Sequence, residues 1–499
     1  MARSTAPAAP PLLNPRGEPV TIVHLTAEYV PYARTGGLAE AIAGLASFQR
    51  AAGHQVAVLM PLYRTVRDEA PDLEPVGQVF RVPLGGASEE ARLFRVAGRT
   101  KGPTVYFIEH LDYFNRAGIY GENGADYPDN ARRFAFFALA ACLAIPRVVQ
   151  GPCVLHAHDW HTALAPIYLR TVLVGERWAE DTHTVVSIHN PGYQGHFGPQ
   201  AMFDLGLPIE LYNWRQLEWY GKVNFLKGGL AFTDSVVTVS PTQAAELRTP
   251  GGGFGLHDMF IELGDRLVGI LNGIDQRVWD PAQDRQITAR YSAEQLEGKQ
   301  RCKTALQRSF GLPQRRKTPL IGMTGRLVTQ KGLDLILNSW GLLGYEAQFV
   351  FLGSGEPRYE QALVELARAA PERIGVQLDF TDKLEHRLMA GTDMFLMPSL
   401  YEPCGLTQMR AQRYGSLPIA RRVGGLADTI EDGVTGFLFE PYDPAALEKA
   451  AFRALEQFLR PPLWTDMMRE AMARDFSWER SVAAYTKVYR RVVATAPRA

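Results

Sequence analysis

Residues 395–408 read Phe-Leu-Met-Pro-Ser-Leu-Tyr-Glu-Pro-Cys-Gly-Leu-Thr-Gln. The apolar run from Met394 to Met397 is typical of a short buried strand, and Pro398 ends it. A turn-prone segment then leads into a helix that we expect from Leu406 onward. Open α/β sheets present ligand groups at the carboxyl ends of their strands in this way. Glu402 is therefore expected in a loop beside a helix N-terminus, whose unpaired N–H groups favour anions.

This stretch has two interpretations. A carboxylate that accepts hydrogen bonds from hydroxyls, next to amides that donate to phosphate, suits a nucleotide-sugar site. Alternatively, Glu402 is a solvated turn residue and Cys404 is a small buried apolar side chain. The rest of the sequence is needed to decide between these two interpretations.

Size and composition indicate a globular chain of two or three domains. The chain has 499 residues, of which 46% are hydrophobic and 21% charged, with Lys+Arg 53 against Asp+Glu 53. This balance argues against a nucleic-acid partner, because such binding depends on basic patches. No apolar run reaches the roughly 18–20 residues that span a bilayer, so we expect no membrane partner.

The cysteines and the N-terminus indicate a cytoplasmic protein. Cys142, Cys153, Cys302 and Cys404 form no CxxC pair and no zinc-binding spacing, which is typical of a reducing compartment. The first residues lack the apolar region of a secretory signal. We expect residues 1–18 to form a disordered Pro/Ala tail, with an organelle transit peptide as the alternative.

The first half of the chain alternates strands and helices. Val20–Leu25 is the first expected strand, a helix opens near Leu38, and Val56–Met60 follows as the next strand, which completes a βαβ unit. Gly36 and Gly37 lie where the backbone approaches a ligand or takes a positive φ; a plain turn is the alternative. Further expected elements are the strands 105–108, 154–158, 185–189 and 236–240 and the helix 132–144. These strands are continuously apolar, which is typical of a doubly wound parallel sheet with both faces covered.

Two of these strands end in polar groups. One leads into His-Ala-His-Asp-Trp-His (156–161) and the next into His189-Asn190. Because no Glu or Cys stands at metal-ligand spacing, we expect no metal here. Asp159 and His189 are interpreted as polar groups at strand ends, and His156 and His158 as hydrogen-bonded structural histidines.

A second α/β series begins after about residue 272. Strands are expected at 319–324, 348–352 and 417–420. Arg326 and Lys331 straddle a strand-to-helix junction, where both can approach one anion over the helix N-terminus. With two of the chain's Gly-Gly pairs, 36–37 and 424–425, and the stretch around Glu402, they suggest a diphosphate clamp in a cleft between two α/β domains. A final helix is expected to begin at Ser477.

The ordered set of motifs resembles the bacterial glycogen synthase and plant starch synthase family. It extends from about Thr21 to Tyr489. Its markers are Arg-Thr-Gly-Gly-Leu-Ala-Glu (34–40), His-Ala-His-Asp-Trp-His (156–161), Ser-Pro-Thr (240–242), Leu-Asn-Gly-Ile-Asp (271–275), Gly-Arg-Leu (325–327), Gln-Lys-Gly-Leu-Asp (330–334), Tyr-Glu-Pro-Cys-Gly-Leu-Thr-Gln (401–408) and Gly-Gly-Leu-Ala-Asp (424–428).

The resemblance implies a fold and a reaction. The fold is two Rossmann-like, doubly wound parallel-sheet domains facing a central cleft, the GT-B type. The N-terminal domain would span 19–265, completed by the C-terminal helix 476–495, and the nucleotide-sugar domain 266–475. The reaction is transfer of glucose from ADP-glucose to glycogen or another α-1,4-glucan, with retention of configuration and without metal or cofactor.

The resemblance also implies residue roles. The catalytic group would comprise Glu402, His189, Arg326, Lys331 and Asp159. Within it, Arg326 and Lys331 would hold the diphosphate, and Glu402 would bind glucose hydroxyls. The substrate-binding positions would be Arg34, Gly36, Gly37, Glu40, Tyr120, Asn190, Asn272, Phe380, Cys404, Gly405, Leu406 and Thr407.

The chain departs from the family pattern at three places. Arg34 stands where the family usually has lysine, Glu40 where it usually has aspartate, and Pro191-Gly192 where Leu-Ala is more common. An arginine fork differs from a lysine point charge, so donor affinity or nucleotide choice could change. Two alternatives therefore stay open: a related enzyme that uses UDP-glucose or a small acceptor, and a catalytically silent glucan-binding homologue. The sequence does not define the oligomeric state.

Overall fold

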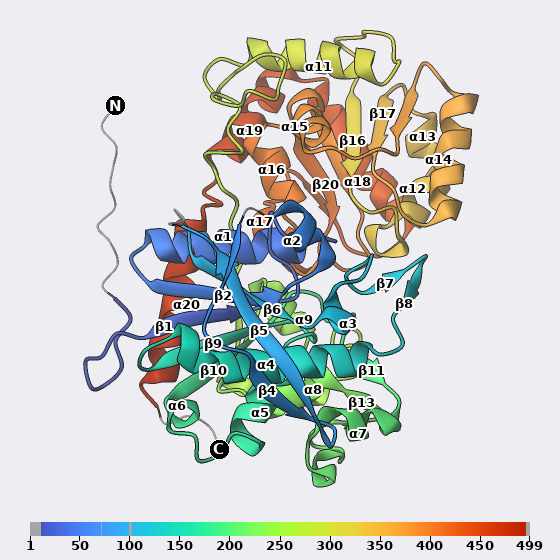
Figure 1. Cartoon of the computed structure of the whole chain (residues 1–499). Coiled ribbons are helices and arrows are strands. Elements are labelled where there is room, and N and C mark those ends of the chain that lie inside the picture. The colour runs from blue at the N-terminus through green and yellow to red at the C-terminus, as the bar shows by residue number, and fades with distance from the viewer. Residues whose placement is uncertain (1–10, 71, 99–101, 496–499) are drawn as a thin grey trace. The chain divides into compact units, whose positions relative to one another are not determined.

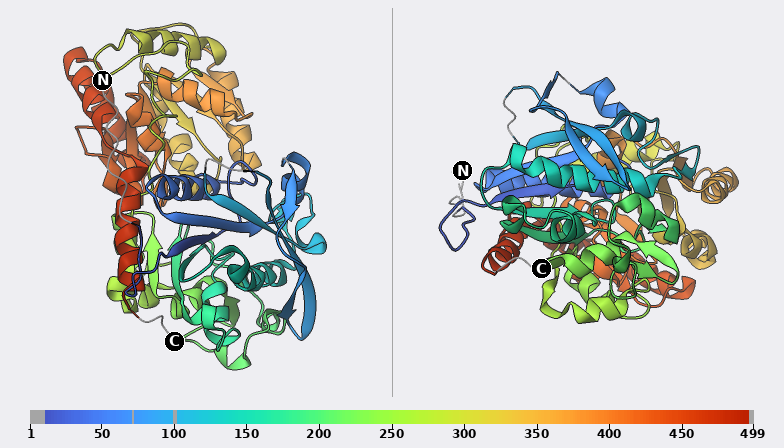
Figure 2. Two further views of the ribbon diagram at one scale, coloured as in Figure 1. Left: turned by 60° about the vertical axis from the view of Figure 1, so that its left-hand side comes forward. Right: turned by 60° about the horizontal axis from the view of Figure 1, so that its bottom comes forward.

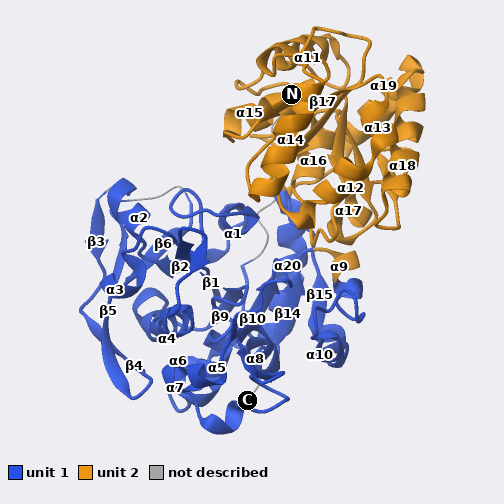
Figure 3. Ribbon diagram, turned by 90° about the vertical axis from the view of Figure 1, so that its right-hand side faces the viewer, with its two compact units in different colours: residues 1–239, 244–273, 478–499 blue, residues 240–243, 274–477 orange. Residues whose placement is uncertain are grey.

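The computed structural model describes residues 11–70, 72–98 and 102–495. The chain divides into two compact units (Figure 3). Unit 1 comprises residues 1–239, 244–273 and 478–499, and unit 2 comprises residues 240–243 and 274–477. Among the described residues, no helix is long and apolar enough to cross a membrane.

Unit 1 is built on a ten-stranded sheet in the order β15-β14-β10-β9-β1-β2-β6-β5-β3, with β4 paired to β5. The strands from β15 to β6 run parallel. Their bounds are β1 Thr21–Leu25, β2 Gln55–Pro61, β6 Thr104–Glu109, β9 Cys153–His158, β10 Thr182–Ile188, β14 Ser235–Thr238 and β15 Leu267–Gly269. Every residue of β1, β9 and β10 is buried, as expected for strands covered on both faces.

Helices cover this sheet (Figures 1 and 2). They are α1 Gly37–Ala51, α2 Arg64–Glu69, α3 Leu111–Phe114, α4 Asn130–Val148, α5 Ala165–Thr171, α6 Arg177–Glu180, α7 Met202–Leu205, α8 Phe225–Phe232, α10 His257–Glu262 and α20 Trp478–Val493. The C-terminal helix α20 packs against α1, where a Cβ on Gly44 would lie 2.4 Å from the Trp478 ring. Val482, Tyr485 and Tyr489 share a buried cluster with Ile22 of β1, so the end of the chain completes the core of unit 1.

One edge of the unit 1 sheet is antiparallel, which the expectation of a parallel sheet missed. The strands there are β3 Leu73–Pro75, β4 Phe80–Leu84 and β5 Ala87–Val96. Gly85 and Gly86 connect β4 to β5 with φ of 57° and 74°, the geometry of a two-residue hairpin turn. Burial alternates along β4, which is typical of a strand with one solvated face.

Short pairs of strands complete unit 1. They are β7 Gly121–Glu122 with β8 Ala125–Asp126, and the small sheet of β11 His196–Phe197, β13 Lys222–Asn224 and β12 Glu218–Trp219.

Unit 2 is a six-stranded parallel sheet in the order β18-β17-β16-β19-β20-β21. Its strands are β16 Leu320–Thr324, β17 Gln348–Leu352, β18 Ile374–Gln377, β19 Met394–Met397, β20 Leu417–Arg421 and β21 Phe437–Phe439. Its helices are α11 Glu297–Ser309, α12 Leu333–Asn338, α13 Trp340–Gly344, α14 Pro357–Ala369, α15 Asp382–Gly391, α16 Thr407–Arg413, α17 Gly424–Thr429, α18 Pro444–Phe458 and α19 Pro461–Ala473; α9, Pro241–Glu246, begins in the segment 240–243.

The division between the units falls at 273/274, later than the expected 265/266. The reason is β15, which pairs in parallel with β14 and so keeps residues 266–273 in unit 1. The expectation of a disordered tail also fails for residues 11–18. Leu12 is buried, Val20 N donates to Leu12 O at 2.8 Å, and Asn14 closes a turn by accepting from Glu18 N. Residues 1–10 of that expected tail lie outside the described residues.

Candidate active site

In unit 2, Lys331 and Glu402 meet at the carboxyl ends of two neighbouring strands. Lys331 follows β16 and Glu402 follows β19, and these strands are paired in parallel. Lys331 Nζ lies 2.6 Å from Glu402 Oε2, which also accepts from Ser399 Oγ at 3.0 Å. The side chains of Lys331 and Glu402 are 23% and 7% exposed. A nearly buried carboxylate is thus held beside a partly accessible cation.

Gly332 allows the lysine segment to approach the Glu402 loop. Its φ is 75°, and a Cβ there would lie 1.9 Å from Pro398 O, so a side chain would push the two segments apart. Backbone contacts hold the same approach: Leu400 N donates to Gln330 O at 2.8 Å. Gln330 also donates from its side chain to Tyr401 O at 3.2 Å.

The pair Gly424–Gly425 supports Glu402 from the other side. Gly424 has a φ of 42°, and its Cβ would lie 2.0 Å from Glu402 O. A Cβ on Gly425 would lie 2.1 Å from Cys404 O, while Gly425 N donates to Glu402 O at 3.1 Å. The start of α17 therefore packs directly on the backbone that carries Glu402.

The remaining expected residues of unit 2 flank this pair. Cys404 is buried, and Gly405, with a φ of 70°, precedes α16, whose first turn starts at Thr407 after Leu406 without a side-chain cap. Arg326 is exposed after β16, and the structure gives its side chain no ion-pair partner among the described residues. Phe380, 38% exposed, follows β18.

In unit 1, the first glycine pair opens α1. Gly36 has φ −160° and ψ −158°, an ordinary extended conformation. No atom of the described residues lies within 4 Å of a Cβ built on Gly36 or Gly37. The positive φ that we considered for this pair is therefore absent. The N-cap residue of α1 is Gly36, which makes no side-chain cap hydrogen bond, and the first N–H groups of a helix suit an anion.

Glu28 organises this glycine loop, and sequence reasoning missed it. Its carboxylate is 3% exposed and accepts from Thr35 N at 2.6 Å, Thr35 Oγ1 at 2.7 Å and Gly36 N at 3.3 Å. Tyr120 donates its hydroxyl to the same carboxylate at 2.6 Å. Burial, followed by the nearby charge of Glu28, raises the pKa of Tyr120 well above its usual value, so it stays a donor. The only sequence signal was an acidic residue three positions after a buried strand.

Arg34 and Glu40, two of the departures from the family pattern, are partners in the structure. Arg34 Nη2 lies 3.1 Å from Glu40 Oε1, with the side chains 38% and 23% exposed. The arginine is thus oriented across the glycine loop toward the first turn of α1.

Asp159 anchors the loop that carries His189 and Asn190. Its Oδ1 accepts from His189 N at 2.7 Å and from Asn190 N at 3.4 Å. Asp159 has a φ of 57°, a strained backbone conformation for a non-glycine residue and one that clusters at functional sites. Burial raises the pKa of Asp159 to about 7, although these backbone N–H groups lower it. Asn272, 7% exposed, follows β15 in the same unit.

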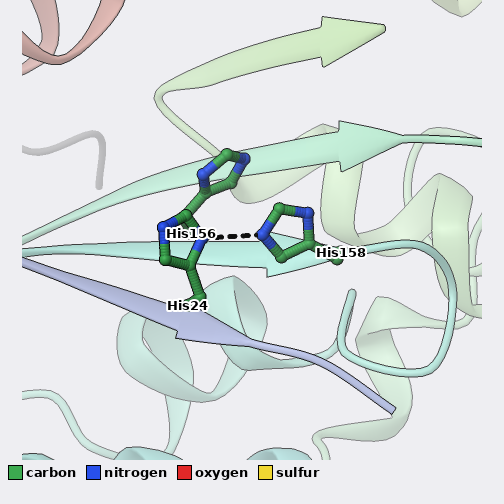
Figure 4. A group of neighbouring side chains, drawn as sticks. All are labelled: His24, His156 and His158. Carbon is green, nitrogen blue, oxygen red and sulfur yellow. Dashed lines mark hydrogen bonds between the residues drawn. The ribbon is translucent and has the colours of Figure 1, made fainter. Parts of the chain in front are cut away.

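Three histidines, His24, His156 and His158, have ring nitrogens within 4.8 Å of one another, close enough to suggest a metal site. Figure 4 shows these rings above β1 and β9, with the hydrogen bond between His24 and His158 dashed. Every ring nitrogen of the three already has a hydrogen-bond partner. In this structure the cluster is a buried hydrogen-bond network in which each ring nitrogen faces a partner.

The expected site residues therefore fall into two groups. Unit 2 contains Arg326, Lys331, Phe380, Glu402, Cys404, Gly405, Leu406 and Thr407, and unit 1 contains Arg34, Gly36, Gly37, Glu40, Tyr120, Asp159, His189, Asn190 and Asn272. Except for Tyr120, which follows α3, each group lies in the segments that follow parallel strands, where open α/β sheets bind ligands. Two such Rossmann-like units, one with a cation–carboxylate pair and one with an uncapped glycine loop, define a GT-B glycosyltransferase.

Comparisons with known proteins give the family. Residues 21–262 match the family described as the starch synthase catalytic domain, and residues 307–467 match glycosyl transferases group 1. A glycogen synthase from Anaeromyxobacter sp. (strain Fw109-5) is 44% identical over 481 residues, covering 95% of this chain and 99% of that protein. One from Syntrophotalea carbinolica is 42% identical over 486 residues, with coverage of 95% and 99%. The chain belongs to the glycogen synthase and starch synthase family of glucosyltransferases.

Solved structures agree with this assignment. The catalytic domain of starch synthase IV from Arabidopsis thaliana, solved with ADP and acarbose, superposes with a TM-score of 0.86 at 33% identity, covering 95% of this chain and 99% of that chain. Sucrose-phosphate synthase from Thermosynechococcus elongatus gives a TM-score of 0.59 at 17% identity, with coverage of 95% and 98%, and so shares the fold.

Proposed function

We propose that this chain transfers glucose from ADP-glucose to the non-reducing end of an α-1,4-glucan such as glycogen, with retention of the anomeric configuration. The observation that carries the proposal is the contact of 2.6 Å between Lys331 and Glu402. A nucleotide sugar needs a cation for its diphosphate and a carboxylate for its sugar hydroxyls, and this pair offers both at adjacent strand ends. The relatives named glycogen synthase support the acceptor.

The donor diphosphate would replace Glu402 as the ion-pair partner of Lys331. When phosphate oxygens reach Lys331 and the exposed Arg326, the lysine turns from Glu402 to the phosphate, and Glu402 becomes free to accept from glucose hydroxyls. The N–H groups of Leu406 and Thr407 at the start of α16 are placed to donate to the same phosphates. Cys404 and Gly405 would form the wall beside the sugar, and Phe380 would stack near the adenine.

Unit 1 would supply the other donors and acceptors. The N–H groups of Gly36 and Gly37 at the start of α1 would donate to the distal phosphate, Gly36 N exchanging its contact of 3.3 Å with Glu28 for the phosphate, with Arg34, Glu40 and Tyr120 around them. The polar groups at strand ends, Asp159, His189, Asn190 and Asn272, would line the sugar.

The chemistry follows from these charges. The bond between the glucose C1 and the diphosphate oxygen breaks as ADP leaves with the electron pair. The 4-hydroxyl of the glucan then forms the new C1–O bond from the same face, and its proton passes to a diphosphate oxygen. Arg326 and Lys331 stabilise the negative charge that grows on the leaving group, and one such preorganised partner typically contributes about 3–4 kcal/mol.

We also propose a cytoplasmic location, where nucleotide sugars and reduced thiols occur together. All four cysteines are buried thiols. A reducing compartment suits them.

The test compares two buried carboxylates of unit 2. Glu402→Gln should retain the wild-type melting temperature and lose about 99% or more of ADP release, since the missing charge corresponds to about 3 kcal/mol. The control is Glu385→Gln, because Glu385 pairs with Arg410 at 3.0 Å, is equally buried and has no role in the site. UDP-glucose is run beside ADP-glucose. Equal turnover of UDP-glucose, or full activity of Glu402→Gln, would contradict the proposal.

A further inference from the structure

A line of buried hydrogen bonds in unit 1 connects helix α1 to His189. Gln49 Oε1 lies 2.7 Å from His24 Nε2, and His24 Nδ1 lies 2.9 Å from His158 Nε2. His158 Nδ1 in turn lies 3.0 Å from His189 Nε2. Gln49, His24 and His158 are fully buried, whereas His189 is half-buried at the end of β10. Nothing in the reaction described above uses the three inner residues.

All the imidazoles in this line are neutral near pH 7. Burial lowers the pKa of His24 to about 4 and that of His189 to about 3. Burial also lowers the pKa of His158 well below its usual value, and the neighbouring histidines lower it further. A neutral imidazole has one N–H donor and one lone pair, so each ring can donate in only one direction along the line.

Gln49 decides that direction. Its Nε2 donates to the hydroxyl of Tyr489 at 3.0 Å, which leaves Oε1 as the acceptor for His24 Nε2–H. His24 then accepts at Nδ1 from His158 Nε2–H. His158 consequently accepts at Nδ1 from His189 Nε2–H. The opposite polarity requires the Gln49 amide to donate to His24 and to accept from Tyr489.

This polarity defines the tautomer of His189, the residue at the outer end of the line. His189 carries its proton on Nε2 and keeps its lone pair on Nδ1, a nitrogen with no hydrogen-bond partner among the residues that the structure describes. The loop position of His189 is fixed separately, because its backbone N–H donates to Asp159 at 2.7 Å.

We propose that Gln49, His24 and His158 are positioning residues that fix the tautomer of His189, so that its Nδ1 accepts a hydrogen bond from a hydroxyl of the transferred glucose. This inference rests on the proposed function for the identity of the sugar. It assigns to His189 the role of acceptor, and it assigns to Gln49, on a helix behind the sheet, control over that role.

The structure provides a matched control in His156. This histidine is also fully buried, and its ring lies 4.1 Å from that of His158, centroid to centroid. Its nitrogens contact Tyr489 and Ser187, at 2.8 Å and 2.6 Å, so it touches the line only through the Tyr489 hydroxyl that accepts from Gln49 and is not one of the links that end at His189.

The direct test is nitrogen NMR of the full chain labelled with ¹⁵N-histidine, without substrate. The chemical shift separates protonated from unprotonated ring nitrogens, and the His189 signals are assigned by their loss in His189→Gln. We expect wild-type His189 to be protonated on Nε2. Gln49→Met, which keeps the side-chain length but removes the acceptor, should shift both His189 nitrogens toward the other tautomer, and His156→Asn should leave them unchanged.

Activity then links the tautomer to the sugar. Gln49→Met should lower kcat/KM for the donor by about tenfold, the value of a hydrogen bond of this kind, and His156→Asn should lower it less than about twofold. Protonation of wild-type His189 on Nδ1, or unchanged His189 shifts in folded Gln49→Met, would overturn the inference. A shifted tautomer with undiminished kcat/KM would overturn it as well. If the wild type turned over no nucleotide sugar, the proposed function would fail, while the spectra would still test the tautomer.

Discussion

The chain has two Gly-Gly pairs at helix starts, one in each unit, and the structure requires glycine at only one of them. At Gly424–Gly425, a Cβ on either residue would lie 2.0–2.1 Å from the carbonyl oxygen of Glu402 or Cys404. At Gly36–Gly37, nothing in the structure lies within 4 Å of a built Cβ, and Gly36 is extended. Gly424–Gly425 is needed for the packing of unit 2, whereas a side chain at Gly36 or Gly37 would contact nothing in the described structure.

This difference separates structural from ligand-related glycines. Glycine is favourable at the N-cap, the position of Gly36, but Gly37 is the first residue of α1, where alanine has the higher helix propensity, so glycine at 37 has no structural explanation. Close approach of a ligand to the backbone would explain the pair at Gly36–Gly37. Four substitutions would break or sharpen this comparison.

The largest effect is expected for Gly425→Ala. The new methyl group cannot avoid Cys404 O, so we expect a loss of about 2–3 kcal/mol in the stability of unit 2 and displacement of the Glu402 backbone. Thermal unfolding and ADP release should both be impaired. Wild-type melting together with wild-type turnover would show that this pair is not structural.

Gly37→Ala should separate stability from activity. The melting temperature should equal or slightly exceed that of the wild type. The KM for ADP-glucose should rise at least about tenfold, because the new methyl group keeps the ligand from approaching the backbone, and a hydrogen bond to a charged group contributes about 1.5–3 kcal/mol. Gly344→Ala is the matched control, because Gly344 also faces open space, at the end of α13 in unit 2. An unchanged KM in Gly37→Ala would assign this pair to a plain turn.

Glu28→Gln should weaken the glycine loop without unfolding unit 1. The amide keeps one acceptor but loses the charge that binds Thr35, Gly36 and Tyr120, so kcat/KM for the donor should fall about fivefold, or about 1 kcal/mol. Tyr120→Phe removes one of the same contacts. Steady-state kinetics of the double variant should show less than additive loss, and strict additivity would mean that the two act independently.

The smallest effect is expected for Arg34→Lys. The Arg34–Glu40 pair is partly exposed, and such pairs contribute about 0–1 kcal/mol, so the melting temperature should not change. The ratio of kcat/KM for ADP-glucose to that for UDP-glucose, measured side by side, should move by less than about fivefold. A larger change would make Arg34 a determinant of nucleotide choice.

Most of the fold could be predicted from the sequence. Continuous apolar runs such as 348–352 and 394–397 coincide with β17 and β19, because strands buried on both faces leave a clear hydrophobic signal. The antiparallel edge was missed, since its strands alternate and its hairpin turn is a Gly-Gly pair that sequence reasoning did not use. The expected boundary at 265/266 ignored β15, a strand of three residues.

The site was predictable by residue type but not by contact. Motif spacing pointed to Lys331 and Glu402, yet their ion pair depends on the close approach at Gly332. Glu28 was missed because the carboxylate is recognised only through its partners, Thr35 and Tyr120, which lie in other segments. The line from Gln49 to His189 likewise joins residues of α1, β1 and β9, which are far apart in the sequence, so no local sequence pattern predicts it.

The most direct test of the proposed reaction is growth of a labelled glucan. Purified protein is incubated with glycogen and ADP-[¹⁴C]glucose, ADP release is measured, and the polymer is digested with β-amylase, which removes α-1,4-linked units from non-reducing ends. We expect ADP release that depends on glycogen, label in the polymer in equal amount, and loss of that label on digestion. ADP release without label in the polymer, or label that β-amylase cannot remove, would contradict α-1,4 elongation with retention.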